Sequence, residues 1–206
     1  MPEKNDLARL EAYSDGVFAI ASTLLVLEVR VPVVPADAPP GALWRGLFDL
    51  WPSYLAFVLG FGSILVMWVN HHYSIRMLSR CSKPFLYANG LLLMTATFMP
   101  FPTALLARYT DTNFAAVATV AYAGYAVLTH LAFLVWSAAM EAPVLLVKPE
   151  VGRERLAQLR RRTVMGVPVY LVTALISWWL PVVGLLLICT LWMSWVMISI
   201  GDASDT

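Results

Sequence analysis

Residues 9–20 read Arg-Leu-Glu-Ala-Tyr-Ser-Asp-Gly-Val-Phe-Ala-Ile and form the start of the first long apolar run of the chain. A guanidinium and a carboxylate there are costly near lipid, so each needs water or a protein partner. On a helix, Arg9 and Tyr13 point in one direction, whereas Ser14 and Asp15 each point elsewhere. Three polar directions cannot all face a single neighbour. They predict a helix enclosed by protein on several sides, with water on one of them, as a conduction path would require.

The composition predicts a membrane protein. Hydrophobic residues make up 60% of the 206 residues and charged residues 13%, whereas a soluble domain has roughly 45–50% and about 25%. The apolar runs predict six transmembrane helices, each near the roughly 17–25 residues that a bilayer requires. These spans are 12–30, 49–72, 84–107, 113–137, 163–180 and 182–200. Almost nothing remains for a soluble domain, so we expect an all-α membrane protein, with one six-helix unit over residues 1–206.

The distribution of Lys and Arg predicts the orientation, because cytosolic loops carry an excess of these residues. Eleven of the 14 lie on the side of the two termini and three on the other. We therefore expect both termini in the cytosol and a multi-pass protein of the cell membrane. The most basic segment, 152–162, is interpreted as a topology anchor on a cytoplasmic loop rather than as a lipid or nucleic-acid site. Acidic residues before Asp15 favour a retained first helix over a cleaved signal peptide.

The first helix continues with an apolar stripe. Ile20, Thr23, Leu24 and Leu27 are spaced by three and four residues, so they share one face with the preceding Arg9 and Tyr13. Ordinary helix packing explains such a stripe. A pore lining of apolar side chains explains it too, because hydrophobic constrictions can gate by dewetting. The polar cluster at the helix start, continuous with the stripe, favours the pore.

A second polar cluster ends the second predicted helix, at the same cytosolic level as Asp15. Its members are Trp68, Asn70, His71 and His72. Their indole, amide and imidazole groups could satisfy Ser14 and Asp15. The histidines could instead be interfacial residues that contact headgroups and water. Both interpretations stay open, as does the question of which histidine turns inward, because neighbours on a helix point about 100° apart.

Enzymatic and metal chemistry are not expected. Beyond the adjacent pair, the only other histidine is His130, and no cysteine lies at ligand spacing, so we predict no metal site, no cofactor and no catalytic residues. His130 is placed near mid-span, where an imidazole is a functional flag, but the sequence identifies no partner for it. Pro100 and Pro102 predict a kink in the third helix, because each removes a helical hydrogen bond.

The first-helix motif resembles a known one. Arg9-x-x-x-Tyr13-Ser14-Asp15 is similar to the Arg-x-x-x-Phe-Ser-Asp motif of the transmembrane protein 175 family of potassium channels, in its short prokaryotic form. The Gly-Val-Phe-Ala-Ile stretch that follows, Trp-x-Asn-His-His at 68–72 and Pro-Phe-Pro-Thr at 100–103 also resemble that family. The likeness covers the whole chain. The family usually has Phe at the position of Tyr13. Tyrosine keeps the aromatic ring and adds a hydroxyl.

This resemblance implies a homotetramer in membrane lipid, in which the first helices line a passive pore for potassium ions. It implies an apolar constriction at Ile20, Leu24 and Leu27, with Thr23 as a polar pore-lining residue. Apolar rings offer no oxygen to replace a hydration shell, and potassium sheds water more cheaply than sodium, so selectivity would be modest. The resemblance also implies a network that holds the first helix, made of Arg9, Tyr13, Ser14, Asp15, Trp68, Asn70, His71 and His72.

Two other classes of function compete with a channel. A proton- or cation-coupled secondary transporter would use Asp15, His71 and His130 as a proton relay. Many transporter folds show internal repeats or Gly/Pro-interrupted helix pairs, and the sequence shows neither. A membrane-embedded enzyme would need titratable groups that converge at one depth, and the candidates are few. No nucleic-acid partner is expected.

Overall fold

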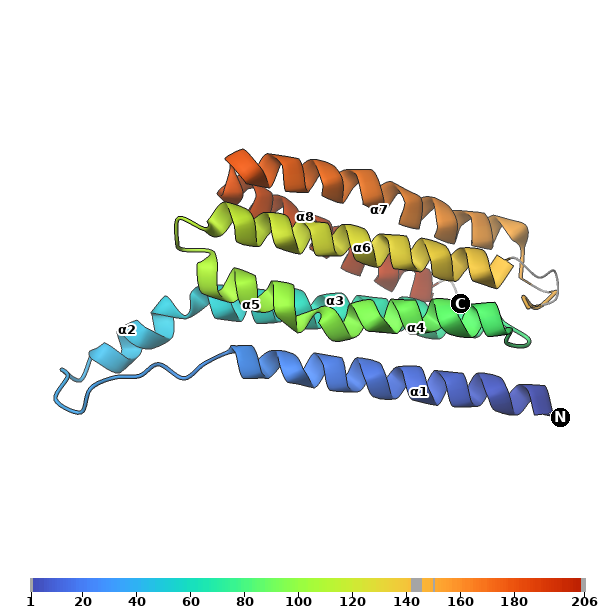
Figure 1. Cartoon of the computed structure of the whole chain (residues 1–206), viewed down its shortest axis with the longest axis horizontal. Coiled ribbons are helices and arrows are strands. Elements are labelled where there is room, and N and C mark those ends of the chain that lie inside the picture. The colour runs from blue at the N-terminus through green and yellow to red at the C-terminus, as the bar shows by residue number, and fades with distance from the viewer. Residues whose placement is uncertain (1, 142–145, 150, 205–206) are drawn as a thin grey trace.

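The computed structural model describes residues 2–141, 146–149 and 151–204, and these are almost entirely helical. The long helices form one bundle (Figure 1). The elements are α1 (Pro2–Leu24), η1 (Leu25–Glu28, a 3₁₀ helix), α2 (Ala42–Asp49), α3 (Trp51–Ile75), α4 (Lys83–Phe98), α5 (Pro100–Tyr109), α6 (Ala115–Glu141), α7 (Arg153–Trp179) and α8 (Pro181–Ser204). The predicted all-α class is therefore confirmed.

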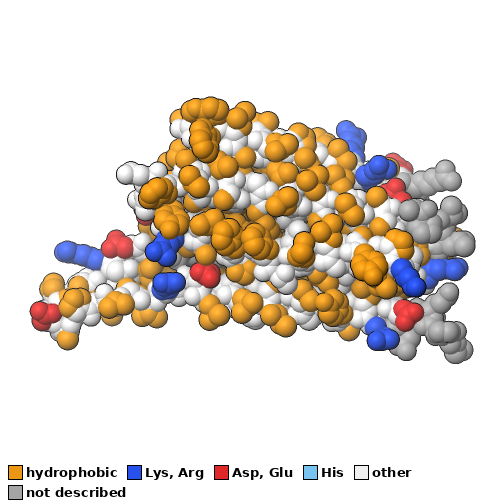
Figure 2. Space-filling view, in the orientation of Figure 1, with side chains coloured by type: hydrophobic (Ala, Val, Ile, Leu, Met, Phe, Trp, Pro, Cys, Tyr) orange, Lys and Arg blue, Asp and Glu red, His pale blue; other side chains and the backbone are white. Residues whose placement is uncertain are grey.

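The bundle has the surface of a membrane protein. Five segments are long and apolar enough to cross a bilayer: Asp6–Glu28, Ala42–Ile75, Lys83–Tyr109, Ala115–Glu141 and Pro181–Gly201. Orange hydrophobic side chains cover the middle of the molecule in Figure 2, and charged side chains gather at its two ends. The two termini lie at the same end of the bundle (Figure 1).

Helix α7 is the sixth long helix, and its start differs from the prediction. It begins at Arg153, so most of the basic segment 152–162 is helical rather than part of a loop. Part of the predicted cytoplasmic link before this helix, residues 142–145 and 150, lies outside the described residues. Only the second part of α7 is apolar, and it turns back at Leu180 into α8 as an antiparallel hairpin.

In two proline-containing regions, the helices differ from the predicted spans. The third predicted span divides into α4 and α5 at Met99, directly before Pro100, which confirms the expected kink. The link between the first two predicted spans, residues 31–48, contains four prolines and would be expected to be a loop. It contains the short helix α2, which extends away from the bundle in Figure 1.

Helix α1 lies at one edge of the bundle and packs on α3 and α4 (Figure 1). Its buried residues recur every three or four positions, as expected for a helix with one face against the core. They are Leu10, Ser14, Phe18, Ala21 and, at the start of η1, Leu25. Leu25 is fully buried because Gly60 of α3 leaves room: a Cβ at Gly60 would lie 3.2 Å from the Leu25 side chain and 2.8 Å from Thr103 Oγ1. This contact holds the end of α1 close to α3 and α5.

A candidate pore helix and the network behind it

The face of α1 that does not touch the bundle carries the apolar stripe. The exposed fractions are 61% for Ile20, 44% for Leu24 and 69% for Leu27, and Thr23 is exposed between them. Leu27 lies in η1, where the helix tightens after Leu24, so the first α-helix ends earlier than the predicted span 12–30. The stripe is therefore a free surface of the single chain.

The opposite face of α1 is joined to α4 by Ser14. This serine is fully buried. Asn89 Nδ2 donates a hydrogen bond to Ser14 Oγ at 3.0 Å, and Ser14 Oγ donates to the Leu10 carbonyl at 2.8 Å. An amide and a hydroxyl so far from water stay satisfied only because each finds the other.

Asn89 connects this serine to two further helices. Its Oδ1 accepts from Trp136 Nε1 of α6 at 3.1 Å and lies 2.8 Å from His71 Nε2 of α3. A carbonyl oxygen can only accept, so His71 Nε2 carries the proton in this arrangement. His71 is fully buried, and its ring also packs on Phe18 and Trp136 with centroid distances of 5.3 and 5.6 Å. One side chain thus links four helices.

A second set of contacts joins α1 to α3 nearer the surface. Trp68 Nε1 donates to Asp15 Oδ1 at 2.8 Å. The His72 ring stacks on Trp68 with a centroid distance of 5.6 Å, and its Nδ1 lies 3.2 Å from Glu11 Oε1. The two adjacent histidines therefore face different neighbours: His71 faces the buried network, and His72 faces the Glu11 carboxylate near the surface.

Three residues of the expected network lie elsewhere. Arg9 and Tyr13 are exposed, Tyr13 at 65%, on the same outer face of α1 as the stripe. Asn70 is not a partner of α1, because two residues after Trp68 the helix has turned about 200°. It lines a cavity on the other side of α3. No described contact within the chain joins Asn70 to the first helix, and its supporting role stays a prediction.

His130 of α6, which the sequence places near mid-span, also lines that cavity. His130 Nδ1 is 2.8 Å from the Ala126 carbonyl, and the ring packs on Tyr170 and Trp195 at 5.1 and 5.2 Å. No described hydrogen bond connects His130 to Asp15 or His71. Over the described residues, no group of three His, Cys, Asp or Glu side chains could hold a metal ion.

Sequence reasoning missed Asn89 and Trp136. A signal for Asn89 was present: it is an amide within the apolar run 84–107, where a polar side chain needs a partner and marks a functional or supporting position. Trp136 gave no such signal, because an indole in an apolar helix is ordinary.

Removing the Asp15 carboxylate should lower the stability of the folded, assembled protein more than it changes ion preference. Asp15→Ala leaves Trp68 Nε1 without its acceptor, at an expected cost of about 2 kcal/mol for a hydrogen bond to a charged group. Asp15→Asn keeps an oxygen for the indole and is the matched control. The measurement is thermal unfolding and oligomeric state in detergent. A stable Asp15→Ala protein with altered selectivity alone would instead make Asp15 an ion ligand.

Comparisons with known proteins identify the family of this chain. The family model described as endosomal/lysosomal potassium channel TMEM175 matches residues 9–100. A protein of Chamaesiphon minutus named a potassium channel is 46% identical over 185 residues, which cover 88% of this chain and 90% of the relative. This chain belongs to the TMEM175 family. The match to the family model includes the whole of the α1 stripe and of the network residues on α1, α3 and α4.

Two further comparisons, with a second sequence and with a solved structure, support the same family. A Streptomyces collinus protein, also named a potassium channel, is 45% identical over 130 residues, 63% of this chain and 62% of its own length. The crystal structure of a lysosomal potassium-selective channel TMEM175 homologue from Chamaesiphon minutus superposes with a TM-score of 0.83 at 39% identity, over 95% of this chain and 98% of that chain. These relatives are ion channels, which places the chain among channels rather than enzymes.

Proposed function

We propose that this protein is a passive, potassium-permeable channel of the cell membrane, formed by a homotetramer with α1 at its axis and both termini in the cytosol. The observation that carries the proposal is the free face of α1. An edge helix presents Ile20, Leu24 and Leu27 outward while its opposite face is fixed to the bundle. Four such faces around one axis would form the pore wall.

The network behind α1 supports this arrangement over simple exposure to lipid. A helix that only faces lipid has no need of a fixed rotation. Ser14 and Asp15 fix the rotation of α1 through side chains of other helices, at 3.0 Å from Asn89 and 2.8 Å from Trp68. A site that must hold narrow rings of side chains requires such support from the residues behind it. Arg9 also lies on the free face, and a charge there suits an aqueous entrance better than hydrocarbon.

Ion selection would follow from the chemistry of the stripe. Rings of Ile20, Leu24 and Leu27 carry no oxygen, so an ion loses water there without a substitute. Potassium loses water at lower cost than sodium, and the apolar rings could close by dewetting. The Thr23 hydroxyl already donates to the Ile20 carbonyl at 2.9 Å, so its oxygen is the polar group left to face the axis. The relatives named as potassium channels agree with this ion.

Silver ions test whether the stripe faces a water-filled path. We expect Ag⁺ to block current through Thr23→Cys, because a thiol on the pore wall is accessible to a monovalent ion. Thr97→Cys is the matched control: Thr97 is equally an exposed threonine, and its hydroxyl bonds to the carbonyl three residues back at 2.9 Å. It lies on α4, outside the proposed pore.

Wild-type protein gives the background of the native thiols in the same recordings. Burial raises the pKa of the Cys81 thiol, and the Asp6 carboxylate adds to the shift, so Cys81 stays protonated and slow to react at neutral pH. Block of Thr97→Cys as strong as that of Thr23→Cys, or no block of Thr23→Cys, would contradict a pore lined by α1.

A further inference from the structure

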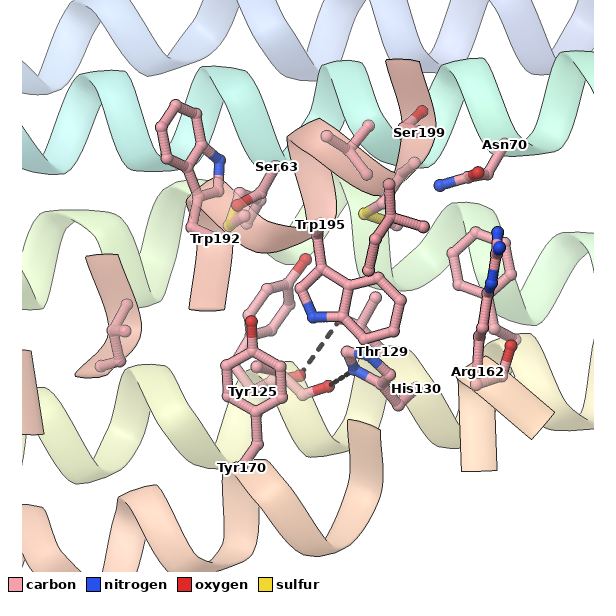
Figure 3. A pocket seen from close by; sticks show the side chains of 18 of the residues that line it. Ser63, Asn70, Tyr125, Thr129, His130, Arg162, Tyr170, Trp192, Trp195 and Ser199 are labelled. Atoms are coloured by element: carbon pink, nitrogen blue, oxygen red, sulfur yellow. Dashed lines mark hydrogen bonds between the residues drawn. The ribbon is translucent and has the colours of Figure 1, made fainter. Parts of the chain in front are cut away.

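A cavity of about 130 Å³ lies between α3, α6, α7 and α8, on the side of α3 away from α1. Figure 3 shows its interior, with Tyr125, Tyr170, Trp192 and Trp195 around the middle. Most of its wall is aromatic or aliphatic. A cavity of this size and lining takes an apolar group rather than water.

A second cavity of about 410 Å³ adjoins the first at the end of the bundle where α7 begins. Its wall is more polar than that of the first cavity and includes Ser74, Glu154 and Arg155. Four residues line both cavities: Asn70, Leu159, Arg162 and Ser199. A polar chamber near the end of the bundle is therefore joined to an apolar one deeper in it.

Two side chains at the junction between the two cavities carry hydrogen-bonding groups that no described residue satisfies. Within the described residues, neither the Asn70 amide nor the Ser199 hydroxyl has a hydrogen-bond partner. The Arg162 guanidinium extends toward Asn70, and Ser199 lies beside them (Figure 3). Deeper in, Trp192 Nε1 is buried without a partner. Among these three groups the indole N–H is buried, whereas the Asn70 amide and the Ser199 hydroxyl line the cavities and are available to a bound group.

The charge and depth of the junction define this ligand. Arg162 directly precedes the apolar part of α7, which places it at the level of lipid headgroups if that part crosses the membrane. Arg155 lies two turns further out, and the outer chamber also receives the N-terminal end of α7, which favours anions. Glu154 lines the outer chamber as well, so an anion is best placed deeper, near Arg162. A guanidinium at the entrance disfavours a cationic amphiphile.

We propose that the two cavities form a binding site for one anionic phospholipid, from the membrane leaflet at the end of the bundle where α7 begins. The phosphate accepts hydrogen bonds from Arg162, Asn70 and Ser199, and part of an acyl chain enters the aromatic cavity. Arginine binds phosphate through paired charge-assisted hydrogen bonds, and basic sites between transmembrane helices on the cytosolic side are typical of anionic headgroups. The basic segment of α7 thus acts as more than a topology anchor.

Native mass spectrometry of the detergent-purified protein tests this site. The protein is titrated with dioleoyl phosphatidylglycerol, with dioleoyl phosphatidylcholine, or with glycerol 3-phosphate, and bound molecules per chain are counted. We expect phosphatidylglycerol to bind in preference to phosphatidylcholine, and glycerol 3-phosphate not to bind. In Arg162→Gln the affinity for phosphatidylglycerol should fall roughly tenfold, as loss of a charged hydrogen bond implies.

The control variant is Arg161→Gln, which makes the same change of charge at the adjacent exposed residue outside both cavities. It should bind phosphatidylglycerol as wild type does. Ser199→Ala removes one hydroxyl without a change of charge and keeps the test valid if Arg162→Gln does not fold; its affinity should fall roughly threefold. Equal losses in Arg161→Gln and Arg162→Gln, equal binding of the two lipids, or binding of glycerol 3-phosphate comparable to that of the lipid would overturn the proposal.

Discussion

Ile20→Asn is expected to raise the single-channel conductance several-fold and to move the permeability ratio of potassium to sodium toward unity. In the proposed tetramer this change would place four amides where an apolar ring stood. Water would then wet the constriction, and the loss of hydration would stop being the step that selects the ion. The two quantities are read from single-channel recordings in planar bilayers, at equal amounts of protein.

The matched control for this change is Leu186→Asn on α8. Leu186 and Ile20 each have 61% of their surface exposed in the single chain, so an amide is equally well tolerated by packing at both positions. Ala21, the neighbour of Ile20, is buried at 1% and would test packing instead. Equal effects at Leu186 and Ile20, or no effect at Ile20, would mean that α1 does not form the pore in the way proposed.

Asn89→Leu should be the most destabilising polar substitution in the bundle. Leucine is close to asparagine in size, so the change removes hydrogen bonds without leaving a large cavity. Trp136 Nε1, His71 Nε2 and Ser14 Oγ would each lose the partner that lies 2.8–3.1 Å away. Buried groups without partners are costly, although hydrogen bonds inside membranes average less than in water, so we expect a loss of about 2–3 kcal/mol.

Thermal or denaturant unfolding of the purified protein in detergent measures this loss. Thr97→Ala is the control on the same helix, since its hydroxyl bonds only to the Met94 carbonyl of its own helix. It should unfold as wild type does. An Asn89→Leu protein as stable as Thr97→Ala would show that the buried network does not hold the four helices together.

Hydrophobic length and proline placement predicted most of the fold. The long apolar runs became helices, and Pro100 divided the third of them. The start of α7 was missed because a basic segment reads as a loop when hydropathy alone defines the helix. In the structure, Arg153–Arg162 continues the helix beyond the apolar part. Helix α2 was missed because the four prolines that precede it in the link 31–48 predict a broken link.

For the candidate site, the sequence could predict which side chains of α1 point in different directions, but not which residues of other helices they contact. Helical spacing correctly separated Ser14 and Asp15 from the face that carries Tyr13, and the structure places these groups against different neighbours. Which partner each would meet depends on how α3 and α4 rotate, and that is set by packing of the whole bundle. Spacing on α3 alone therefore could not show that Asn70 points away from α1. The roles of the stripe residues in conduction stay predictions.

The reversal potential of the purified protein in a planar bilayer tests the central claim most directly. With potassium on one side and an equal concentration of sodium on the other, a potassium-permeable channel with an apolar constriction should reverse at a potential displaced toward the equilibrium potential of potassium. The current should consist of discrete openings without any coupled ion. A reversal potential at zero, or a slow saturating flux that depends on protons, would contradict the account.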